Sequence, residues 1–280
     1  MDFTVEDYGA LVVLVQNSLY AGALLGVVGG LIGVFVMTRE LQFAVHGISE
    51  LSFAGASVAL FFGLNVVFGA ALGSLIAAVL IGLLGVRARD RNSIIAVLMP
   101  FGLGIGILFL ALYPGRSANK FGLLTGQIVS VDNDQLWLLV LISIVVIVGL
   151  GVMWRPLSFA SVDAEVARAR GLPVGLLSVT FMVLLGLAVA VAIQVVGALL
   201  VLSLLVTPAA AAMRVASGPI SIPALSVVFA VVSIVGGTLL SLAGALPISP
   251  FVTTISFAIY VVCRIVAAVR GRSAGSVRLV

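Results

Sequence analysis

Residues 10–37 read ALVVLVQNSLYAGALLGVVGGLIGVFVM, an apolar run that contains no charged side chain. Because about 20 helical residues cross the ~30 Å hydrocarbon core of a bilayer, this run is long enough to span a membrane. A secretory signal peptide would begin with Lys or Arg, whereas Asp2, Glu6 and Asp7 come first here and the first basic residue is Arg39. The run therefore predicts a transmembrane helix that the protein retains.

The composition of the whole chain agrees with this prediction. Of 280 residues, 62% are hydrophobic and 9% are charged, whereas soluble globular proteins have roughly 45–50% apolar and about 25% charged residues. The chain is therefore expected to be an integral membrane protein, and neither a soluble enzyme nor a disordered one. Its basic excess fits loops that face the cytoplasm, so no nucleic-acid partner is expected. The single cysteine, Cys263, allows no intramolecular disulfide.

Charges, prolines and clusters of Gly, Asn and Ser divide the chain into about nine apolar spans. The predicted spans are residues 10–37, 41–62, 66–86, 93–113, 135–153, 174–193, 195–213, 223–245 and 250–268. Only Gln194 and Gly197 mark a turn between the sixth and seventh spans. One helix from Pro173 to Met213 would be about 60 Å long, however, which is enough for two crossings. We expect an all-α polytopic membrane protein with a single transmembrane domain over residues 1–280.

The basic residues at the ends of the spans predict the orientation, because cytoplasmic loops are enriched in Lys and Arg. With the N-terminus outside and the C-terminus inside, 12 of the 14 basic residues face the cytoplasm. These are Arg39, Arg87, Arg89, Arg91, Arg155, Arg168, Arg170, Arg214, Arg264, Arg270, Arg272 and Arg278. The outer side receives only Arg116 and Lys120, together with acidic residues that include Asp132 and Asp134.

The second span carries the most conspicuous polar residues, in the sequence HGISE at residues 46–50. His46 is the only histidine of the chain. On a helix, His46 and Glu50 share one face with Cβ atoms roughly 5–6 Å apart, so an imidazole nitrogen and a carboxylate oxygen can bind one divalent cation. A neutral His–Glu contact between helices, or an interfacial pair, is the alternative. Further metal ligands would have to come from elsewhere in the chain, from water or from a second subunit.

The single histidine and the single lysine of the chain limit the enzyme classes to which it could belong. A zinc peptidase of the H-E-x-x-H type needs two histidines. An intramembrane hydrolase would have to use His46 as its base, and it stays an alternative from another class. The only lysine, Lys120, is not in a glycine-rich P-loop sequence, so the chain is not expected to bind ATP in that manner. Any dependence on ATP would require a separate subunit.

The longest predicted cytoplasmic loop runs from Trp154 to Pro173. Within it, residues 163–170 (DAEVARAR) predict a short helix, since acidic residues come first and basic residues last. Gly171 and Pro173 are expected to end it. Val166 and Ala167 would form a small apolar knob between charges, which suits docking on a cytosolic partner. An ordinary solvated connector is the alternative.

Three runs of sequence resemble the membrane subunit of zinc- and manganese-uptake ABC importers, the metal permease family often called ABC-3. The first run is GGLIGVFV at residues 29–36, which leads to HGISELSFAG at residues 46–55. The second is DAEVARARGLP at residues 163–173, and the third and most specific is VGALLVLSLLVTPAA at residues 196–210. The similarity covers nearly the whole chain.

The resemblance implies a type II-like ABC importer permease bundle in the cytoplasmic or inner cell membrane. It implies a homodimer with two cytosolic ABC ATPase subunits, which supply ATP hydrolysis, and an extracytoplasmic metal-binding protein. The segment at about residues 155–173 would dock on the ATPase through Asp163, Glu165, Val166, Ala167 and Gly171. Zn²⁺ first and Mn²⁺ next would be the transported substrate, with no permanently bound cofactor. A permease for a metal chelate or a cobalamin-type substrate is the alternative within ABC importers.

The second span departs from the family pattern at one point. The family often places Asp first and His four residues later, whereas this chain has His46 and Glu50. One nitrogen and one oxygen ligand are kept at the same helical spacing. The resemblance therefore implies that His46 and Glu50 contact the metal, and two such pairs across a dimer axis would supply two N and two O ligands.

Overall fold

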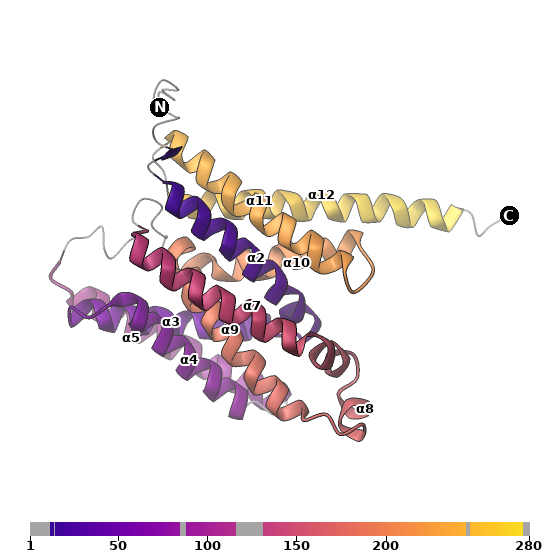
Figure 1. Ribbon diagram of the computed structural model, residues 1–280, viewed down its shortest axis with the longest axis horizontal. Coiled ribbons are helices and arrows are strands. Elements are labelled where there is room, and N and C mark those ends of the chain that lie inside the picture. The colour runs from indigo at the N-terminus through magenta and orange to yellow at the C-terminus, as the bar shows by residue number, and fades with distance from the viewer. Residues whose placement is uncertain (1–11, 14, 85–87, 116–130, 245–246, 277–280) are drawn as a thin grey trace.

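The structure is a computed structural model that describes residues 12–13, 15–84, 88–115, 131–244 and 247–276. Helices make up all of its regular structure, and these residues include no strand (Figure 1). The helices are α2 (Gln16–Thr38), α3 (Gln42–Phe61), α4 (Val66–Leu84), α5 (Ala88–Leu112), α7 (Asn133–Val162), α8 (Ala164–Ala169), α9 (Val174–Val196), η2 (Ala198–Leu200), α10 (Val201–Val215), α11 (Ser221–Gly244) and α12 (Ile248–Ser276).

Each of the nine predicted spans corresponds to one of these helices, which confirms the all-helical membrane fold. Eight helices are long and apolar enough to cross a bilayer: α2, α3, α4, α5, α7, α9, α11 and α12. The seventh predicted span is the shorter helix α10, of 15 residues. Whether α10 crosses the membrane completely therefore stays a prediction.

The separation of α9 from α10 confirms the predicted turn near Gly197. Gly197 has φ of +83°, which ends α9, and the 3₁₀ turn η2 follows at once. The hydroxyl of Ser249 donates to the carbonyl of Val196 at 2.7 Å, and that of Ser49 donates to the carbonyl of Ala198 at 3.1 Å. Because an unpaired backbone group is costly in a bilayer, these two serines stabilise the irregular backbone at the bend.

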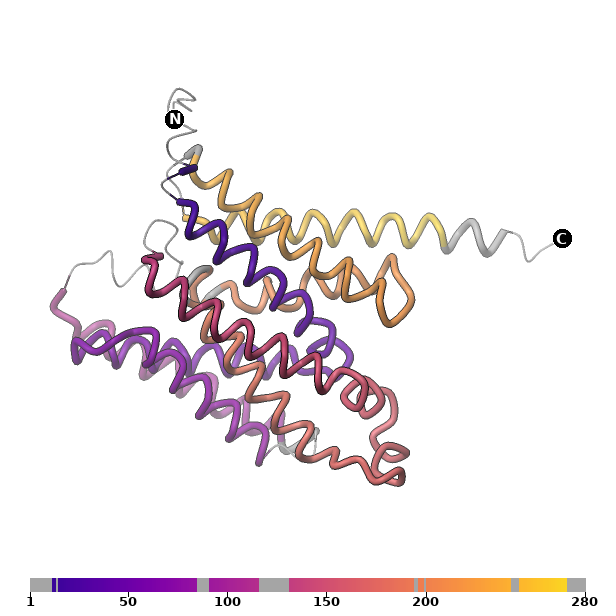
Figure 2. The backbone as a smooth tube through the Cα atoms, viewed as in Figure 1, coloured from indigo at the N-terminus to yellow at the C-terminus, as the bar shows by residue number. Residues whose placement is uncertain are grey.

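Helix α7 differs from the prediction at its C-terminal end. The sequence suggested a loop from Trp154, but α7 continues through Pro156 to Val162. Pro156 lacks an N–H donor and so bends the helix without ending it; Figure 2 shows the last turns of α7 leaving the direction of the rest. The ring of Trp154 packs edge-on against Phe35 of α2, with centroids 4.8 Å apart, and this contact supports the continued helix.

Close helix packing uses small residues, as expected for membrane helices. A side chain at Gly30 of α2 would overlap the backbone of Val227 in α11, and the Ser226 hydroxyl donates to the Gly30 carbonyl at 2.8 Å. Helices α2, α3 and α9 form the middle of the bundle, where Leu25, Phe53 and Phe181 are fully buried. Helices α5, α7 and α12 lie outside and are mostly uncovered.

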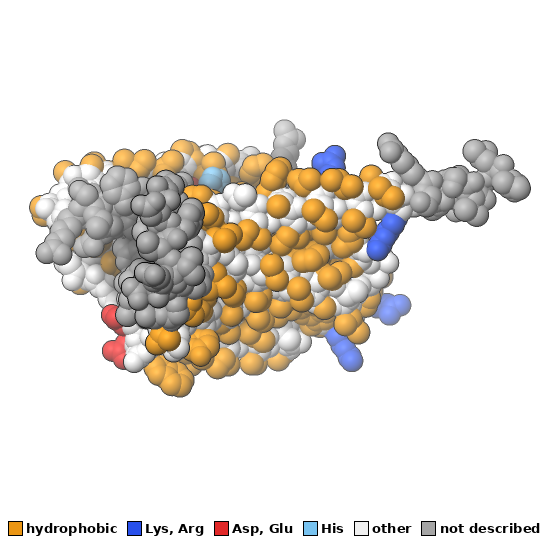
Figure 3. Space-filling view, turned by 90° about the horizontal axis from the view of Figure 1, so that it is seen from above, with side chains coloured by type: hydrophobic (Ala, Val, Ile, Leu, Met, Phe, Trp, Pro, Cys, Tyr) orange, Lys and Arg blue, Asp and Glu red, His pale blue; other side chains and the backbone are white. Residues whose placement is uncertain are grey.

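Charged side chains separate along the length of the molecule. Figure 3 shows arginine side chains toward one end of the visible face, acidic side chains at the other, and mainly hydrophobic side chains between them. The start of α2 and the end of α12 also lie at opposite ends (Figure 1), as an odd number of crossings requires. Arg116 and Lys120, and the acidic residues Asp2, Glu6 and Asp7, lie outside the described residues. The orientation of the chain in the membrane stays a prediction.

Candidate functional site

Helix α3 brings His46 and Glu50 together on one face. The Nε2 atom of His46 lies 3.8 Å from Oε1 of Glu50, which is too long for a hydrogen bond between them. Two ligand atoms that bind one zinc ion at about 2.1 Å lie no more than about 4.2 Å apart. The pair is therefore already within the separation that a shared divalent cation requires.

The two side chains differ in their access to the surface. The side chain of Glu50 is 7% exposed, whereas that of His46 is 33% exposed. Helix α5 packs closely over Glu50, because Gly102 has no side chain: a Cβ there would lie 3.0 Å from the Glu50 carbonyl carbon. The carboxylate is thus inside the bundle, and the imidazole stands between it and the surface.

Among the described residues, the one polar contact of the Glu50 carboxylate is with the imidazole of His46. A carboxylate within a membrane helix is expensive to bury and needs a proton, a donor or a cation. Ser49 and Ser52, the nearest hydroxyls in the sequence, are bonded elsewhere, to the carbonyls of Ala198 and Ala70. A bound cation, a proton or water would satisfy the carboxylate.

One chain supplies only part of a metal site. Over the residues that the structure describes, no group of three or more His, Cys, Asp and Glu side chains comes together. His46 and Glu50 would therefore give one N and one O ligand. The remaining positions of a four-coordinate ion would come from water, backbone carbonyls or another subunit.

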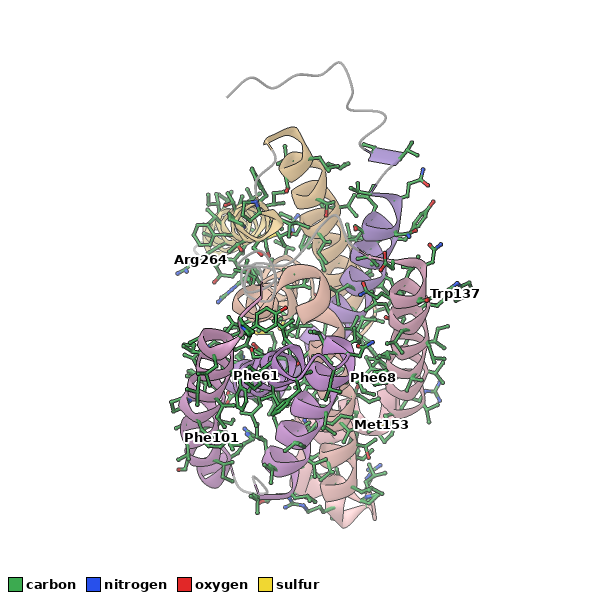
Figure 4. All side chains as sticks on the ribbon, turned by 90° about the vertical axis from the view of Figure 1, so that its left-hand side faces the viewer. Phe61, Phe68, Phe101, Trp137, Met153 and Arg264 are labelled. Carbon is green, nitrogen blue, oxygen red and sulfur yellow. The ribbon has the colours of Figure 1, made fainter. Side chains whose placement is uncertain are left out.

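Helix α10, which contacts α3, carries two hydroxyl residues that the sequence analysis did not name. Its buried side includes Leu204, Leu205 and Ala209, whereas Ser203 and Thr207 lie on its partly exposed side. The two hydroxyl residues are four apart and so share one face. The spacing of Ser203 and Thr207 can be read from the sequence, but the run at residues 196–210 was interpreted only as a family resemblance. Figure 4 shows α5, marked by Phe101, and α12, marked by Arg264, on the same side of the bundle.

The predicted helix near residue 163 is present as α8. The carboxylate of Asp163 accepts hydrogen bonds from the backbone N–H groups of Glu165 at 3.0 Å and Val166 at 2.9 Å, which caps the helix. Gly171 ends it with φ of +81°. The guanidinium of Arg170 lies over the ring of Phe159 at 5.7 Å. The segment is therefore an ordered projection fixed to the end of α7.

The apolar knob expected on α8 is smaller than predicted. Val166 is 43% exposed, but Ala167 is fully buried, since it packs against Ala160 and Val174. Its small side chain lets α8 approach α7 and α9, which the sequence pattern of the segment did not reveal. The exposed side chains of α8 and its two caps are Val166 and Ala169 together with the charged residues Asp163, Glu165, Arg168 and Arg170.

This architecture, a bundle of membrane-spanning helices with a capped helix projecting from one end, defines a polytopic membrane protein. The sequence matches the ABC 3 transport family over residues 12–267. The chain belongs to this family.

Similar sequences include three bacterial membrane proteins. The manganese transport system membrane protein MntC of Halalkalibacterium halodurans is 29% identical over 223 residues, which are 79% of this chain and 76% of that protein. MntC of Listeria innocua is 30% identical over 207 residues, 74% and 72% of the two chains. The manganese import system permease protein ScaB of Streptococcus parasanguinis is 28% identical over 198 residues, 70% of each chain.

Two solved structures share the fold. PsaBC of Streptococcus pneumoniae, solved in complex with a Fab, matches with a TM-score of 0.82 at 23% identity and covers 93% of this chain and 95% of that chain. An inward-facing ABC transporter of metal-chelate type matches with a TM-score of 0.70 at 18% identity, covering 89% and 85%. At these identities the likeness establishes the fold.

Proposed function

We propose that this chain is the membrane permease subunit of an ATP-driven importer for divalent transition metal ions. The observation that carries the proposal is the Glu50 carboxylate, which is buried in α3 and has the imidazole of His46, at 3.8 Å, as its one polar contact among the described residues. A divalent ion passing this point would neutralise the carboxylate and use the imidazole nitrogen as its second ligand. Membership of a transport family supports the same assignment.

We place manganese ahead of zinc as the transported ion, which reverses the order suggested by the residue types. The relatives MntC and ScaB are described as manganese transport proteins, and this supports the order. Carboxylate oxygens suit Mn²⁺, and imidazole nitrogen suits Zn²⁺. Because the pair offers one carboxylate and one imidazole, both ions are acceptable to the site.

The proposal includes a homodimer, because one chain supplies two ligands. Two copies of His46 and Glu50 across a two-fold axis would give two N and two O atoms, enough for a four-coordinate site. The partial exposure of His46 supports a shared path. Ser203 and Thr207 of α10 would line the path with hydroxyl groups.

Two separate ABC ATPases would drive transport, and α8 would dock on one of them in each chain. The exposed Val166 with its ring of charges supports this role, whereas the buried Ala167 would act by holding α8 against the bundle. Asp163 and Gly171 would fix the start and end of the helix, and Glu165 would take part in the charged surface. An extracytoplasmic protein would deliver the metal to the opposite side.

A second candidate, a permease for a metal chelate, is supported by the shared fold of the metal-chelate type transporter. It would not need His46 and Glu50 to bind a bare ion, so uptake of a chelate would be insensitive to changes at these residues. The intramembrane hydrolase is not supported. The chain has one G-x-S-x-G sequence, at residues 271–275, but it lies at the end of α12 and not at a strand-to-helix turn.

The test is uptake of radiolabelled Mn²⁺ and Zn²⁺ by cells that express the chain with its ATPase and binding protein. We expect Glu50→Gln and His46→Ala to reduce uptake by about 10- to 100-fold, the range seen when metal sites lose a supporting group. Glu40→Gln is the matched control, because Glu40 is an exposed glutamate outside the helices. Full uptake by Glu50→Gln, at equal protein in the membrane, would contradict the ligand role.

A further inference from the structure

A cavity of about 450 Å³ lies among the turn between α2 and α3, the adjoining ends of α4, α5 and α9, and α8. Its polar lining consists of Arg39, Arg91, Arg168 and Ser178, and the rest of its lining is apolar or glycine. No acidic side chain is among the described lining residues. Three arginines therefore line one space that is distinct from the His46–Glu50 pair.

Arg39 is held in a fixed position beside this cavity. It donates a hydrogen bond to the Ser178 hydroxyl at 2.6 Å and another to the Ser161 hydroxyl at 3.4 Å. Its guanidinium also lies 5.9 Å from the centre of the Phe181 ring. A guanidinium has five N–H donors, so these bonds leave donors that a ligand can use.

The positive charge of the cavity is not balanced by the described part of the chain. The Nε atom of Arg91 is buried and has no hydrogen-bond partner there, and the only ion pair among the described residues is the one between His46 and Glu50. Glu40 acts on Arg91 through its charge but does not line the cavity. Burial, and then the charge of Arg91, lower the pKa of Arg39.

The apolar part of the lining indicates which kind of anion fits. Leu83 of α4 and Leu176 of α9 are 57% and 66% exposed, and both belong to helices of membrane-spanning length. A soluble anion gains nothing from these side chains, whereas a lipid can place its phosphate among the arginines and its acyl chains along the leucines. Basic pockets between transmembrane helices near the cytoplasmic surface are suited to such headgroups.

We propose that this cavity binds the headgroup of an anionic phospholipid from the leaflet on the α8 side of the membrane. Arg39, Arg91 and Arg168 would contact the phosphate, and Leu83 and Leu176 would contact the acyl chains. Such a lipid would connect α8 with α4 and α9, so it would stabilise the position of the proposed docking helix. The site does not depend on the metal specificity of the transporter.

The test is the binding of phosphatidylglycerol to the purified full-length chain in detergent, counted by native mass spectrometry and checked by thermal unfolding. We expect retained phosphatidylglycerol and a higher unfolding temperature, with no such effect from phosphatidylcholine. Arg91→Gln should weaken the lipid affinity about fivefold, which is equivalent to the ~1 kcal/mol that each basic residue contributes near an anionic surface. Arg214→Gln is the matched control, since Arg214 is an exposed arginine that does not line the cavity.

Each other outcome contradicts the proposal. Equal binding of phosphatidylcholine would show that the arginines do not select the headgroup. Equal stabilisation by inorganic phosphate or glycerol phosphate would show a site for a soluble anion. If Arg91→Gln does not fold, Arg168→Gln replaces it, because Arg168 lies on the exposed surface of α8. Unchanged phosphatidylglycerol binding in the folded variant would overturn the assignment.

Discussion

At the scale of single residues, serine hydroxyls connect helices that are far apart in the sequence. Ser49, Ser226 and Ser249 each donate to a backbone carbonyl of another helical element. Such bonds replace the hydrophobic attraction that is absent between helices in lipid. The spacing of His46 and Glu50 could be predicted from the sequence, because it is a local helical relation. The partner of Ser49, which is 149 positions away, could not.

The Ser49 hydroxyl gives a prediction about the candidate metal site. Ser49→Ala should lower the free energy of unfolding by about 0.5–2 kcal/mol, since the Ala198 carbonyl loses its donor. It should also reduce metal uptake, because the hydrogen bond from Ser49 to Ala198 fixes the residue next to Glu50 against η2, the turn before α10. Stability is measured by denaturant titration in detergent, and uptake by the radiolabelled assay.

Ser52→Ala is the control for this prediction. Its hydroxyl is equally buried on α3 but donates to Ala70 of α4, away from α10. We expect the same loss of stability with nearly unchanged uptake. Equal uptake in both variants would mean that the contact between α3 and the turn serves the fold alone.

At the scale of elements, the sequence predicted where helices occur better than where they end. Helix α8 was predicted with its acidic first turn and its terminal glycine because these are local features. The end of α7 was predicted wrongly, since a loop was expected from Trp154 while the contact of Trp154 with Phe35 supports a bent helix. The burial of Ala167 also depends on distant residues, Ala160 and Val174, and was not predictable from the segment.

Helix α8 provides a prediction about coupling to the ATPase. Val166→Asp should abolish metal-stimulated ATP hydrolysis or release the ATPase during purification, because a charge replaces the larger of the two exposed apolar side chains of α8. The folded state should be unaffected, since Val166 does not belong to the buried cluster. The measurements are ATPase activity of the purified complex and subunit ratio on a gel.

Two neighbouring variants separate docking from folding. Ala169→Asp also adds an acidic side chain at an exposed position of α8, and coupling should be reduced much less. Ala167→Asp should destabilise the chain by more than about 2 kcal/mol, because it buries an unpaired carboxylate. Normal coupling in Val166→Asp would identify α8 as a connector.

At the scale of the whole molecule, the membrane orientation that we expect follows from the number of spans and from the distribution of arginines at their ends. Composition established the membrane class, and the uneven distribution of arginines predicted the orientation, because both effects add up over the whole chain. The packing of the helices was not predictable in the same way. It depends on contacts such as that of Gly30 with Val227, which join residues remote in the sequence.

The orientation is tested with single cysteines in a chain that carries Cys263→Ala. A cysteine at Gln135, an exposed position at the start of α7, should react with a membrane-impermeant thiol reagent on intact cells. A cysteine at Val162, which is 88% exposed at the other end of the same helix, should react only after the cells are opened. The reverse pattern would invert the orientation and remove α8 from the cytoplasm.

The bend at Gly197 has a consequence for the biogenesis of the protein. The carbonyl of Val196 accepts its hydrogen bond from Ser249 of α12, a helix that the ribosome makes after α9 and α10. While α12 is still being synthesised, the bend between α9 and α10 lacks this donor, and an unpaired carbonyl is costly in lipid. Arrival of α12 therefore completes the bend as a later step of assembly. A nascent chain that stops before Ile248 would keep this bend open to the quality-control proteases of the membrane.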